Sequence, residues 1–223
     1  NDNGTMVQVA VTDLSAYFDD EITAMPNLVT VGAANTLTTV AGIPFYQGDS
    51  GSIYTHDVSG TDDTATKNTA YGLTALDAIT TGDNNTATGY AALSANTTGA
   101  SNVAVGKDAL KANTTAGSNT AIGLQSLFTN TTGANNTATG SQALYSNSTG
   151  SYNAAVGESA LYTNSTGANN VAVGRIALYN NTADDNTAVG YAALTANTTG
   201  ANNVAVGKNA LLANTTAANN VAL

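Results

Sequence analysis

The stretch Asn203–Asn219 reads NVAVGKNALLANTTAAN, and close copies of it fill most of the chain. Each copy can be located by the glycine of its Ala-x-Gly triplet. That glycine falls at Gly72, Gly89, Gly106, Gly123, Gly140, Gly157, Gly174, Gly190 and Gly207, a spacing of 17 residues broken once by a spacing of 16. A fixed internal period is the signature of repeat architectures, so the chain is predicted to be an array of stacked units.

One unit, numbered from its first Asn, follows the pattern N-[TV]-A-[VT]-G-x-x-A-L-x-x-N-T-T-G-A-N, and nine units run from Asn68 to Asn219. A helical repeat holds two helices and needs about 33 residues or more, so this unit is too short for one. Its glycines and its Asn-Thr-Thr run disfavour a helix, whereas the [TV]-A-[VT] segment suits a strand. The x-x-A-L-x-x segment fits either a second strand or one helical turn. We therefore predict an all-β solenoid with one coil per unit.

Stacking would place equivalent side chains above one another about 4.8 Å apart, giving a rod of roughly 40 Å for nine units. The Ala at position 3 is expected to mark a close approach of two backbones, and the Gly at position 5 a corner with positive φ. The Asn at position 12 is expected to stack its amides coil upon coil. Position 9 is the predicted buried core line, formed by Leu76, Leu93, Leu110, Leu127, Leu144, Leu161, Leu178, Leu194 and Leu211.

The irregular unit, Asn170–Asp185, has lost one residue and ends in Ala183-Asp184-Asp185. The pattern resumes at once at Asn186, with Leu178 and Leu194 still at position 9. A shift of one residue within a strand would turn its apolar side chains to water, so the loss is predicted at a surface corner where both carboxylates are wet.

Composition sets the domain boundary and excludes several partners. Residues 1–67 hold nine of the fifteen carboxylates, whereas charged residues are scarce in 68–223. We read 1–67 as a β-rich connector, with strands expected at Thr5–Val11, Asn27–Val31 and Thr36–Val40 and turns at Gly42–Pro44 and Gly48–Gly51, and 68–223 as the solenoid shaft. The net charge of −10 argues against nucleic acid and anionic lipid. Apolar runs fall far short of the ~20 residues that span a bilayer, so no membrane insertion is expected.

The core of one coil is thin, because it holds one Leu, two Val or Thr and a few Ala. The chain also has no cysteine, and scaffolds with thin cores and no disulfide are commonly stabilised by oligomerisation. The expected partner is the chain itself, with the Ala and Val ladders as the seam. A solenoid end also needs a polar cap, and none precedes Leu223, so the fold is expected to continue beyond it.

The recurring Asn-Val-Ala-Val-Gly of 102–106, 170–174 and 203–207 resembles the Val-Ala-Ile-Gly repeats of trimeric autotransporter adhesin heads, which form a trimeric left-handed β-roll. The longer stretch 186–200, NTAVGYAALTANTTG, is similar to repeats of bacteriophage tail fibres and related bacterial surface proteins. The resemblance covers about 70% of the chain. It implies a homotrimeric extracellular fibre, on a virion or on a bacterial cell, that binds a host-surface glycan or protein. The 17-residue period is longer than the adhesin repeat, and no coiled-coil stalk, membrane anchor or self-cleaving chaperone module accompanies it.

Position 10 carries the candidate binding residues, because four successive units place an aromatic there: Phe128, Tyr145, Tyr162 and Tyr179. Such a stripe on a rod suits a receptor or a glycan. The alternative interpretation is simple ladder stacking or a seam between chains.

The sequence does not supply a catalytic set, and the protein is expected not to be an enzyme. The single His56 has no matched nucleophile and orienting group. A glycan depolymerase needs two nearby carboxylates. Asp184 and Asp185 are the best pair, but adjacent residues of a strand face opposite ways, and Glu158 and Asp108 lie three units apart.

No cofactor is expected. Calcium is the one metal considered, at Asp19-Asp20-Glu21 or at Asp62-Asp63, although neither matches a calcium-loop motif. The Asn-x-Thr sequons at Asn96 and Asn147 repeat with the unit and cannot carry glycan if position 12 faces inward. An ice-binding solenoid is a further alternative, weakened because Thr97 and Thr98 are adjacent and do not alternate.

Overall fold

A computed structural model describes residues 39–40, 43–44, 46–47, 53–54 and 64–223 of the chain. These residues contain strands and turns and no helix. The strands are β1 (Thr39–Val40), β2 (Ile43–Pro44), β3 (Tyr46–Gln47), β4 (Ile53–Tyr54), β5 (Thr69–Tyr71), β6 (Thr86–Thr88), β7 (Val103–Val105), β8 (Thr120–Ile122), β9 (Thr137–Thr139), β10 (Ala154–Val156), β11 (Val171–Val173), β12 (Thr187–Val189), β13 (Val204–Val206) and β14 (Val221–Ala222).

The chain divides into two units, Asn1–Tyr46 and Gln47–Leu223. In the first unit β1 and β2 pair antiparallel, with Val40 opposite Ile43. Ile43 and Pro44 of the expected Gly42–Pro44 turn therefore belong to a strand, and Gly42 lies outside the described residues. The other strands and turns expected before residue 53 lie outside the described residues, except for Thr39–Val40.

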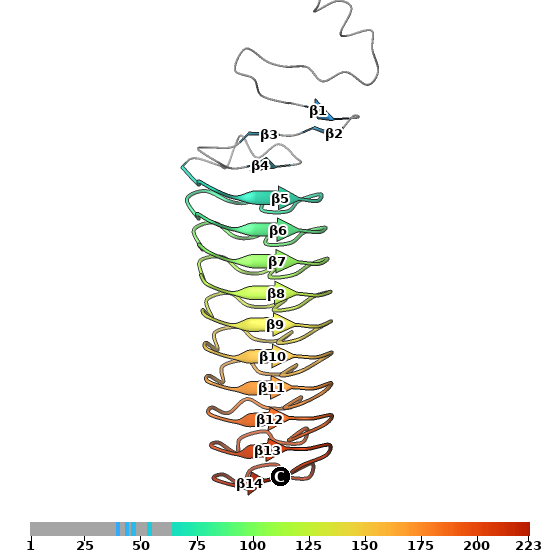
Figure 1. The fold of residues 1–223 in the computed structure, drawn as a ribbon. Helices are drawn as coiled ribbons and strands as arrows, with labels where there is room; N and C mark the ends of the chain where they lie inside the picture. Colours follow the sequence, from blue (N-terminus) through green and yellow to red (C-terminus); the bar gives the residue numbers. More distant parts are fainter. Residues whose placement is uncertain (1–38, 41–42, 45, 48–52, 55–63) are drawn as a thin grey trace, which may run out of the picture. The chain divides into compact units, whose positions relative to one another are not determined.

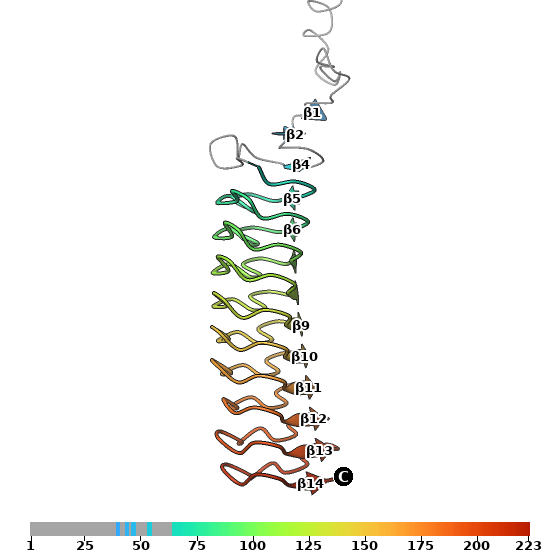
Figure 2. The same cartoon turned by 90° about the vertical axis from the view of Figure 1, so that its left-hand side faces the viewer.

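In the second unit the strands β4 to β14 form one parallel sheet in sequence order. Figures 1 and 2 show one strand in each coil, with the strands stacked along one side. The register keeps equivalent positions together, as in Ala155 opposite Ala172. The prediction of an all-β solenoid with one coil per repeat is confirmed. The sheet also extends before the repeats, because β4 pairs with β5.

The segment after each strand is a pair of tight turns and is neither a second strand nor a helical turn. In the fifth coil Ala143 N–H donates to Gly140 O at 3.3 Å, and Asn147 N–H donates to Leu144 O at 3.2 Å. Positions 5, 7, 9 and 17 of each coil have positive φ. The corner glycine predicted at position 5 is confirmed, with φ of 139° at Gly140. The leucines share this backbone region at φ of 49–56°, which side chains rarely adopt and the sequence did not suggest.

The core contains the predicted leucine line, because eight of the nine leucines have no exposed surface and Leu211 is partly buried. The Ala of position 3 is also fully inside the coil, as at Ala104 and Ala155. The expectation that the Ala ladder forms a seam between chains is therefore wrong. Leu at position 9 already fills the narrow interior, so only alanine fits opposite it and the larger strand side chains point outward.

Two buried asparagine ladders run through the stack. At position 12, Asn147 Nδ2 donates to Asn130 Oδ1 of the preceding coil at 2.8 Å, which confirms the predicted amide ladder. A second ladder, at position 1, was not predicted: Asn153 N–H donates to Asn136 Oδ1 at 3.0 Å. From the second coil on, both ladders meet at one carbonyl in each coil, as where Asn136 Nδ2 and Asn147 Nδ2 both donate to Gly150 O.

The short coil keeps its core register, as predicted. Val171 pairs with Thr187 across 16 residues, and Leu178 and Leu194 are both fully buried. Asp184 and Asp185 are exposed. The missing residue is thus absorbed at a wet corner, and the strand ladder is unaffected.

Candidate functional site

Positions 2 and 4 of strands β5 to β13 point away from the core, and we call this surface the outer sheet face. None of its members is charged in any of these strands. Val105 is 36% exposed, Ile122 41% and Val156 42%. The apolar members that are more than a third exposed are Tyr71, Val105, Ile122, Val156, Val171, Val173 and Val206. The face is therefore a flat strip of Val, Ile and Thr that follows the stack.

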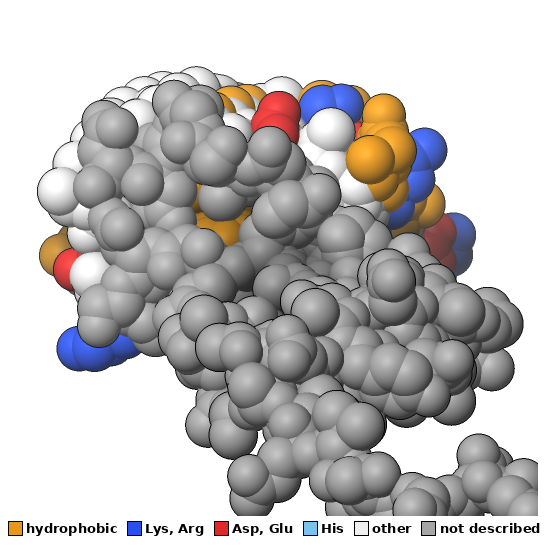
Figure 3. Space-filling model, turned by 90° about the horizontal axis from the view of Figure 1, so that it is seen from above, with side chains coloured by type: hydrophobic (Ala, Val, Ile, Leu, Met, Phe, Trp, Pro, Cys, Tyr) orange, Lys and Arg blue, Asp and Glu red, His pale blue; other side chains and the backbone are white. Residues whose placement is uncertain are grey.

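The charged residues of the shaft lie elsewhere. In Figure 3, which looks down on the first coils, the visible Lys, Arg, Asp and Glu side chains are few and lie around the edge of the described surface. Glu158 and Arg175 form an exposed ion pair at 3.1 Å, and Lys111 lies 2.9 Å from Asp108. The carboxyl pair Glu158 and Asp108 considered for catalysis is thus divided between two separate ion pairs.

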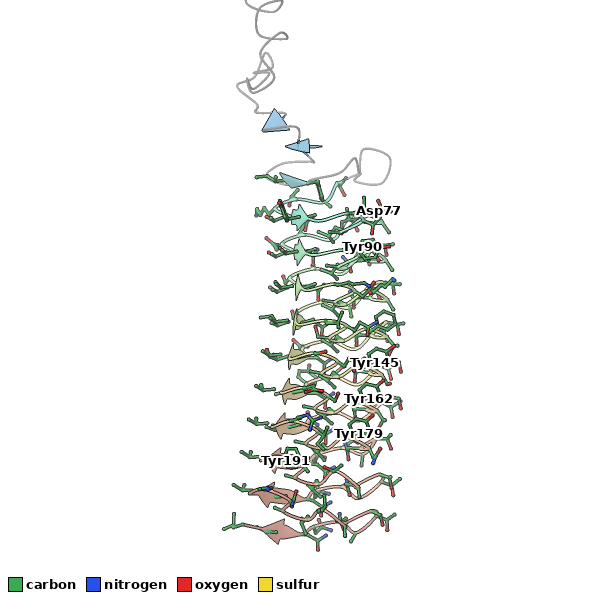
Figure 4. All side chains as sticks on the ribbon, turned by 90° about the vertical axis from the view of Figure 1, so that its right-hand side faces the viewer. Asp77, Tyr90, Tyr145, Tyr162, Tyr179 and Tyr191 are labelled. Carbon is green, nitrogen blue, oxygen red and sulfur yellow. The ribbon has the colours of Figure 1, made fainter. Side chains whose placement is uncertain are left out.

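The four aromatic residues of position 10 form a continuous stack, which we call the aromatic column. Ring centroids are 5.1 Å apart between Phe128 and Tyr145, and 5.0 Å apart between Tyr145 and Tyr162 and between Tyr162 and Tyr179. The planes of neighbouring rings differ by 3–7°. Figure 4 shows Tyr145, Tyr162 and Tyr179 one below another. The parallel register of the coils imposes this arrangement, because equivalent side chains repeat at the strand spacing.

Stacking decides which ring surfaces a ligand can reach. The inner rings cover one another, and the outer face of Phe128 lies under the Lys111 ammonium, 5.7 Å from the ring centroid. Beyond Tyr179 the column ends at Thr195, whose hydroxyl donates to Ile176 O at 2.9 Å. The column therefore presents ring edges, three phenol hydroxyls and one ring face that no further aromatic covers, that of Tyr179.

The stack also affects ionisation. Burial between its neighbours raises the pKa of Tyr162 above its ordinary value of 10.0, and repulsion from Tyr145 and Tyr179 raises this pKa further. At the first corner the opposite holds for Asp83. The hydrogen bonds that Thr66 N–H and Oγ1 donate to its carboxylate, at 2.7 and 3.0 Å, lower the pKa of Asp83, and burial opposes them.

The raised Tyr162 pKa predicts a loss of stability at alkaline pH. The folded chain holds this proton more tightly than the unfolded chain, so the contribution is present below about pH 10 and is lost as pH rises through the folded pKa. The fall in melting temperature from about pH 9 to about pH 11 should be smaller in Tyr162→Phe, by a few degrees at most, because phenylalanine keeps the stack without the titrating group. Thermal unfolding followed by circular dichroism measures this, with Tyr152→Phe as the control. Equal falls in both variants would contradict the prediction.

Several residues considered from the sequence do not contribute a site in the described part of the chain. His56, Asp19-Asp20-Glu21 and Asp62-Asp63 lie outside it. Within it, no group of three or more His, Cys, Asp or Glu is placed to hold a metal ion. Asp184 Oδ1 accepts a hydrogen bond from Ala168 N–H at 2.8 Å.

The sequons at Asn96 and Asn147 are closed in the folded chain, because both side chains have no exposed surface. A search of the described residues for a helix long and apolar enough to cross a membrane finds none. Comparison with protein-family models, with curated proteins and with solved structures finds no match to this chain.

Proposed function

We propose that the chain is a rigid segment of an extracellular fibre, assembled from three copies, that binds a host-cell surface. The outer sheet face carries this proposal. It is flat, uncharged in every repeated strand and apolar over much of its length. Extended apolar patches on a protein surface are characteristic of interfaces. The thin core within each coil adds to the need for a partner.

A second copy of the chain suits this face. Each coil offers two uncharged outward side chains at the same rise, so two copies can meet along the whole face. The chain has a net charge of −10, and an uncharged face lets copies meet without bringing their carboxylates together. The three-fold number comes from the resemblance to adhesin heads and tail fibres. The leading assignment is a phage tail fibre, and the alternative is the head of a bacterial trimeric surface adhesin.

The oligomer can be tested with charges placed on or off the face. Native mass spectrometry and analytical ultracentrifugation of the parent chain should give a trimer. The triple variant Val105→Glu, Val156→Glu, Val173→Glu should give a folded monomer, because each carboxylate would be buried in the seam. The matched control Thr115→Glu, Thr132→Glu, Thr149→Glu changes exposed residues off the face and should remain trimeric. A monomeric parent, or a triple face variant that stays trimeric, would overturn the proposed assembly.

Host binding is assigned to the aromatic column, which lies apart from the outer sheet face and stays open when copies meet through that face. Tyrosine joins an apolar ring to a polar tip, which suits a sugar with CH and hydroxyl groups on one surface. We expect Tyr179→Ala to lower binding to immobilised bacterial surface polysaccharide about tenfold, as the loss of one stacking contact of about 1–1.5 kcal/mol would. Tyr152, exposed and off the column, gives the control Tyr152→Ala. Equal binding by both variants would contradict this assignment.

The structure also gives the ice-binding alternative a specific location. Alternating outward threonines do occur, at Thr86 and Thr88 and at Thr137 and Thr139 on the outer sheet face. These threonines occupy positions 2 and 4, whereas Thr97 and Thr98 occupy the adjacent positions 13 and 14. Ice binding would require the face to be free, so an ice recrystallisation assay on the parent chain separates the two functions: strong inhibition would favour ice binding over the fibre.

A further inference from the structure

The sequence Asn-Ser-Thr-Gly occurs twice in neighbouring coils, at 147–150 and at 164–167, in different surroundings. In the first copy the asparagine oxygen, the serine hydroxyl and two backbone amides are bonded to the next coil. Asn147 Oδ1 accepts from Asn164 Nδ2 at 3.0 Å. Ser148 N–H and Thr149 N–H both donate to Ser165 O, at 2.9 and 3.1 Å, and Ser148 Oγ donates to the same oxygen at 2.9 Å.

The second copy faces the short coil and loses these bonds. Asn164 Oδ1 is fully buried and has no hydrogen-bond partner among the described residues. In the same part of the structure, Ser165 N–H and Thr166 N–H donate to no other residue, and Thr182 O accepts from none. Asn181 Nδ2, which would continue the ladder to Asn164, donates to Ala183 O at 2.8 Å. The position-12 ladder is thus broken between these two coils.

The defect is confined to one corner. On one side Thr163 N–H still donates to Tyr179 O at 3.0 Å. On the other side Asp185 N–H still donates to Ala168 O at 3.1 Å, and the strands remain in register. The missing residue therefore leaves unpaired polar groups between 164–166 and 181–183, a site that we call the notch, with the exposed Asp184 after it.

The groups left without partners form a complementary set. Asn164 Oδ1 and Thr182 O are acceptors that converge, since a Cβ placed on Gly167 would lie within 3.0 Å of both. Ser165 N–H and Thr166 N–H are donors from the same turn. A buried amide oxygen left unpaired costs about 1–3 kcal/mol, and buried waters typically make about three hydrogen bonds to such groups.

We propose that the notch is a binding site for an ordered water molecule, which donates to Asn164 Oδ1 and Thr182 O and accepts from the Ser165 or Thr166 amide. The site takes neutral water because its ligating groups are amides and carbonyls. The position-12 ladder is thereby divided into a run that ends at Asn164 and a run that begins at Asn181.

Hydrogen exchange tests this on the unmodified chain, because the two Asn-Ser-Thr-Gly segments have the same intrinsic exchange rates. Resolved by mass spectrometry with fragmentation, the amides of Ser165 and Thr166 should exchange at least about tenfold faster than those of Ser148 and Thr149, as expected for one missing backbone bond. Inserting one threonine between Thr182 and Ala183 gives the short coil the sequence Asn-Thr-Thr-Ala, as at 113–116. This insertion should slow amide exchange at Ser165 and Thr166 to the rates of Ser148 and Thr149.

A high-resolution crystal structure of the parent supplies the second readout. A water peak within hydrogen-bonding distance of Asn164 Oδ1 is expected. Equal exchange of the two segments in the parent, or a well-ordered notch without that peak, would overturn the proposal. If the insertion variant does not fold, the parent comparison and the crystal structure still decide the outcome.

Discussion

Replacing Asn136 with alanine is expected to lower the free energy of unfolding by about 3 kcal/mol, although asparagine is an ordinary residue of turns and surfaces. The side chain is fully buried and has partners in two directions. Its Nδ2 donates to Gly150 O at 2.8 Å, and its Oδ1 accepts from Asn153 N–H at 3.0 Å. Alanine would leave the buried Asn153 backbone donor unpaired, at a cost of about 1–3 kcal/mol, and would remove the bond to Gly150.

Urea unfolding at one fixed protein concentration, followed by circular dichroism, measures this difference. Thr132→Ala is the matched control, because Thr132 is exposed and lies four residues before Asn136, at the end of the preceding repeat. It should change stability by less than about 0.5 kcal/mol. A loss for Asn136→Ala as small as that of the control would show that the position-1 ladder does not stabilise the stack.

The position-1 ladder also marks a limit of reading the sequence. The position-12 asparagines were predicted to stack, because the residue recurs at that position in eight of the nine units. The position-1 asparagines follow a Gly-Ala-Asn turn and look like part of it. Their role depends on the position-15 carbonyl, such as Gly150 O, which returns to them only once the coil has closed. No local pattern encodes that closure.

The orientation of the strand is a second limit. The 17-residue period predicted one coil per unit, and the recurrence of leucine at position 9 predicted which side chains line the core. The alternation Val-Ala-Val does not say which side is inside, and size alone favours burying valine. In the structure Ala104 is fully buried in the same core cluster as Leu110, and Val105 is exposed. Side chains from different parts of the coil compete for one narrow interior, and this competition decides which face of the strand is buried. A three-residue pattern does not contain that information.

The aromatic column was found from the sequence as a set of residues, but its chemistry was not. Recurrence at position 10 predicted that the four rings would be neighbours. Centroid distances of 5.0–5.1 Å show that they cover one another's faces. At this spacing the inner ring faces are covered, so a ligand is expected to stack on the ring face of Tyr179 that no further aromatic covers.

The glycine of position 5 carries the largest expected effect. Gly140→Ala should lower the free energy of unfolding by about 4 kcal/mol, because two costs add. The residue has φ of 139°, a region that side chains strongly disfavour, at about 1–3 kcal/mol. A Cβ there would also lie 2.5 Å from Gly157 O in the next coil, and such overpacking costs about 1–3 kcal/mol.

A steric clash of the added Cβ does not by itself predict a loss as large as that of Gly140→Ala. Gly150, which would also clash but lacks positive φ, is the comparison. A Cβ on Gly150 would also meet the backbone of the next coil closely, at Gly167 O. Yet the third coil accepts an alanine at position 15, Ala116, which is only 5% exposed. Gly150 does not have positive φ, so a small shift of its neighbour is enough. Gly150→Ala is therefore expected to cost about 1 kcal/mol.

In the chain of residues 1–223 no further position-5 glycine follows Gly207, so a Cβ on it would meet nothing closer than 4.0 Å, although its φ is 130°. In this chain Gly207 therefore separates the two costs at position 5. Gly207→Ala should lose only the backbone share, about 1–3 kcal/mol. The expected order of destabilisation in urea unfolding is Gly140→Ala, then Gly207→Ala, then Gly150→Ala. If Gly150→Ala proved as damaging as Gly140→Ala, close packing between coils, and not backbone conformation, would be what reserves position 5 for glycine.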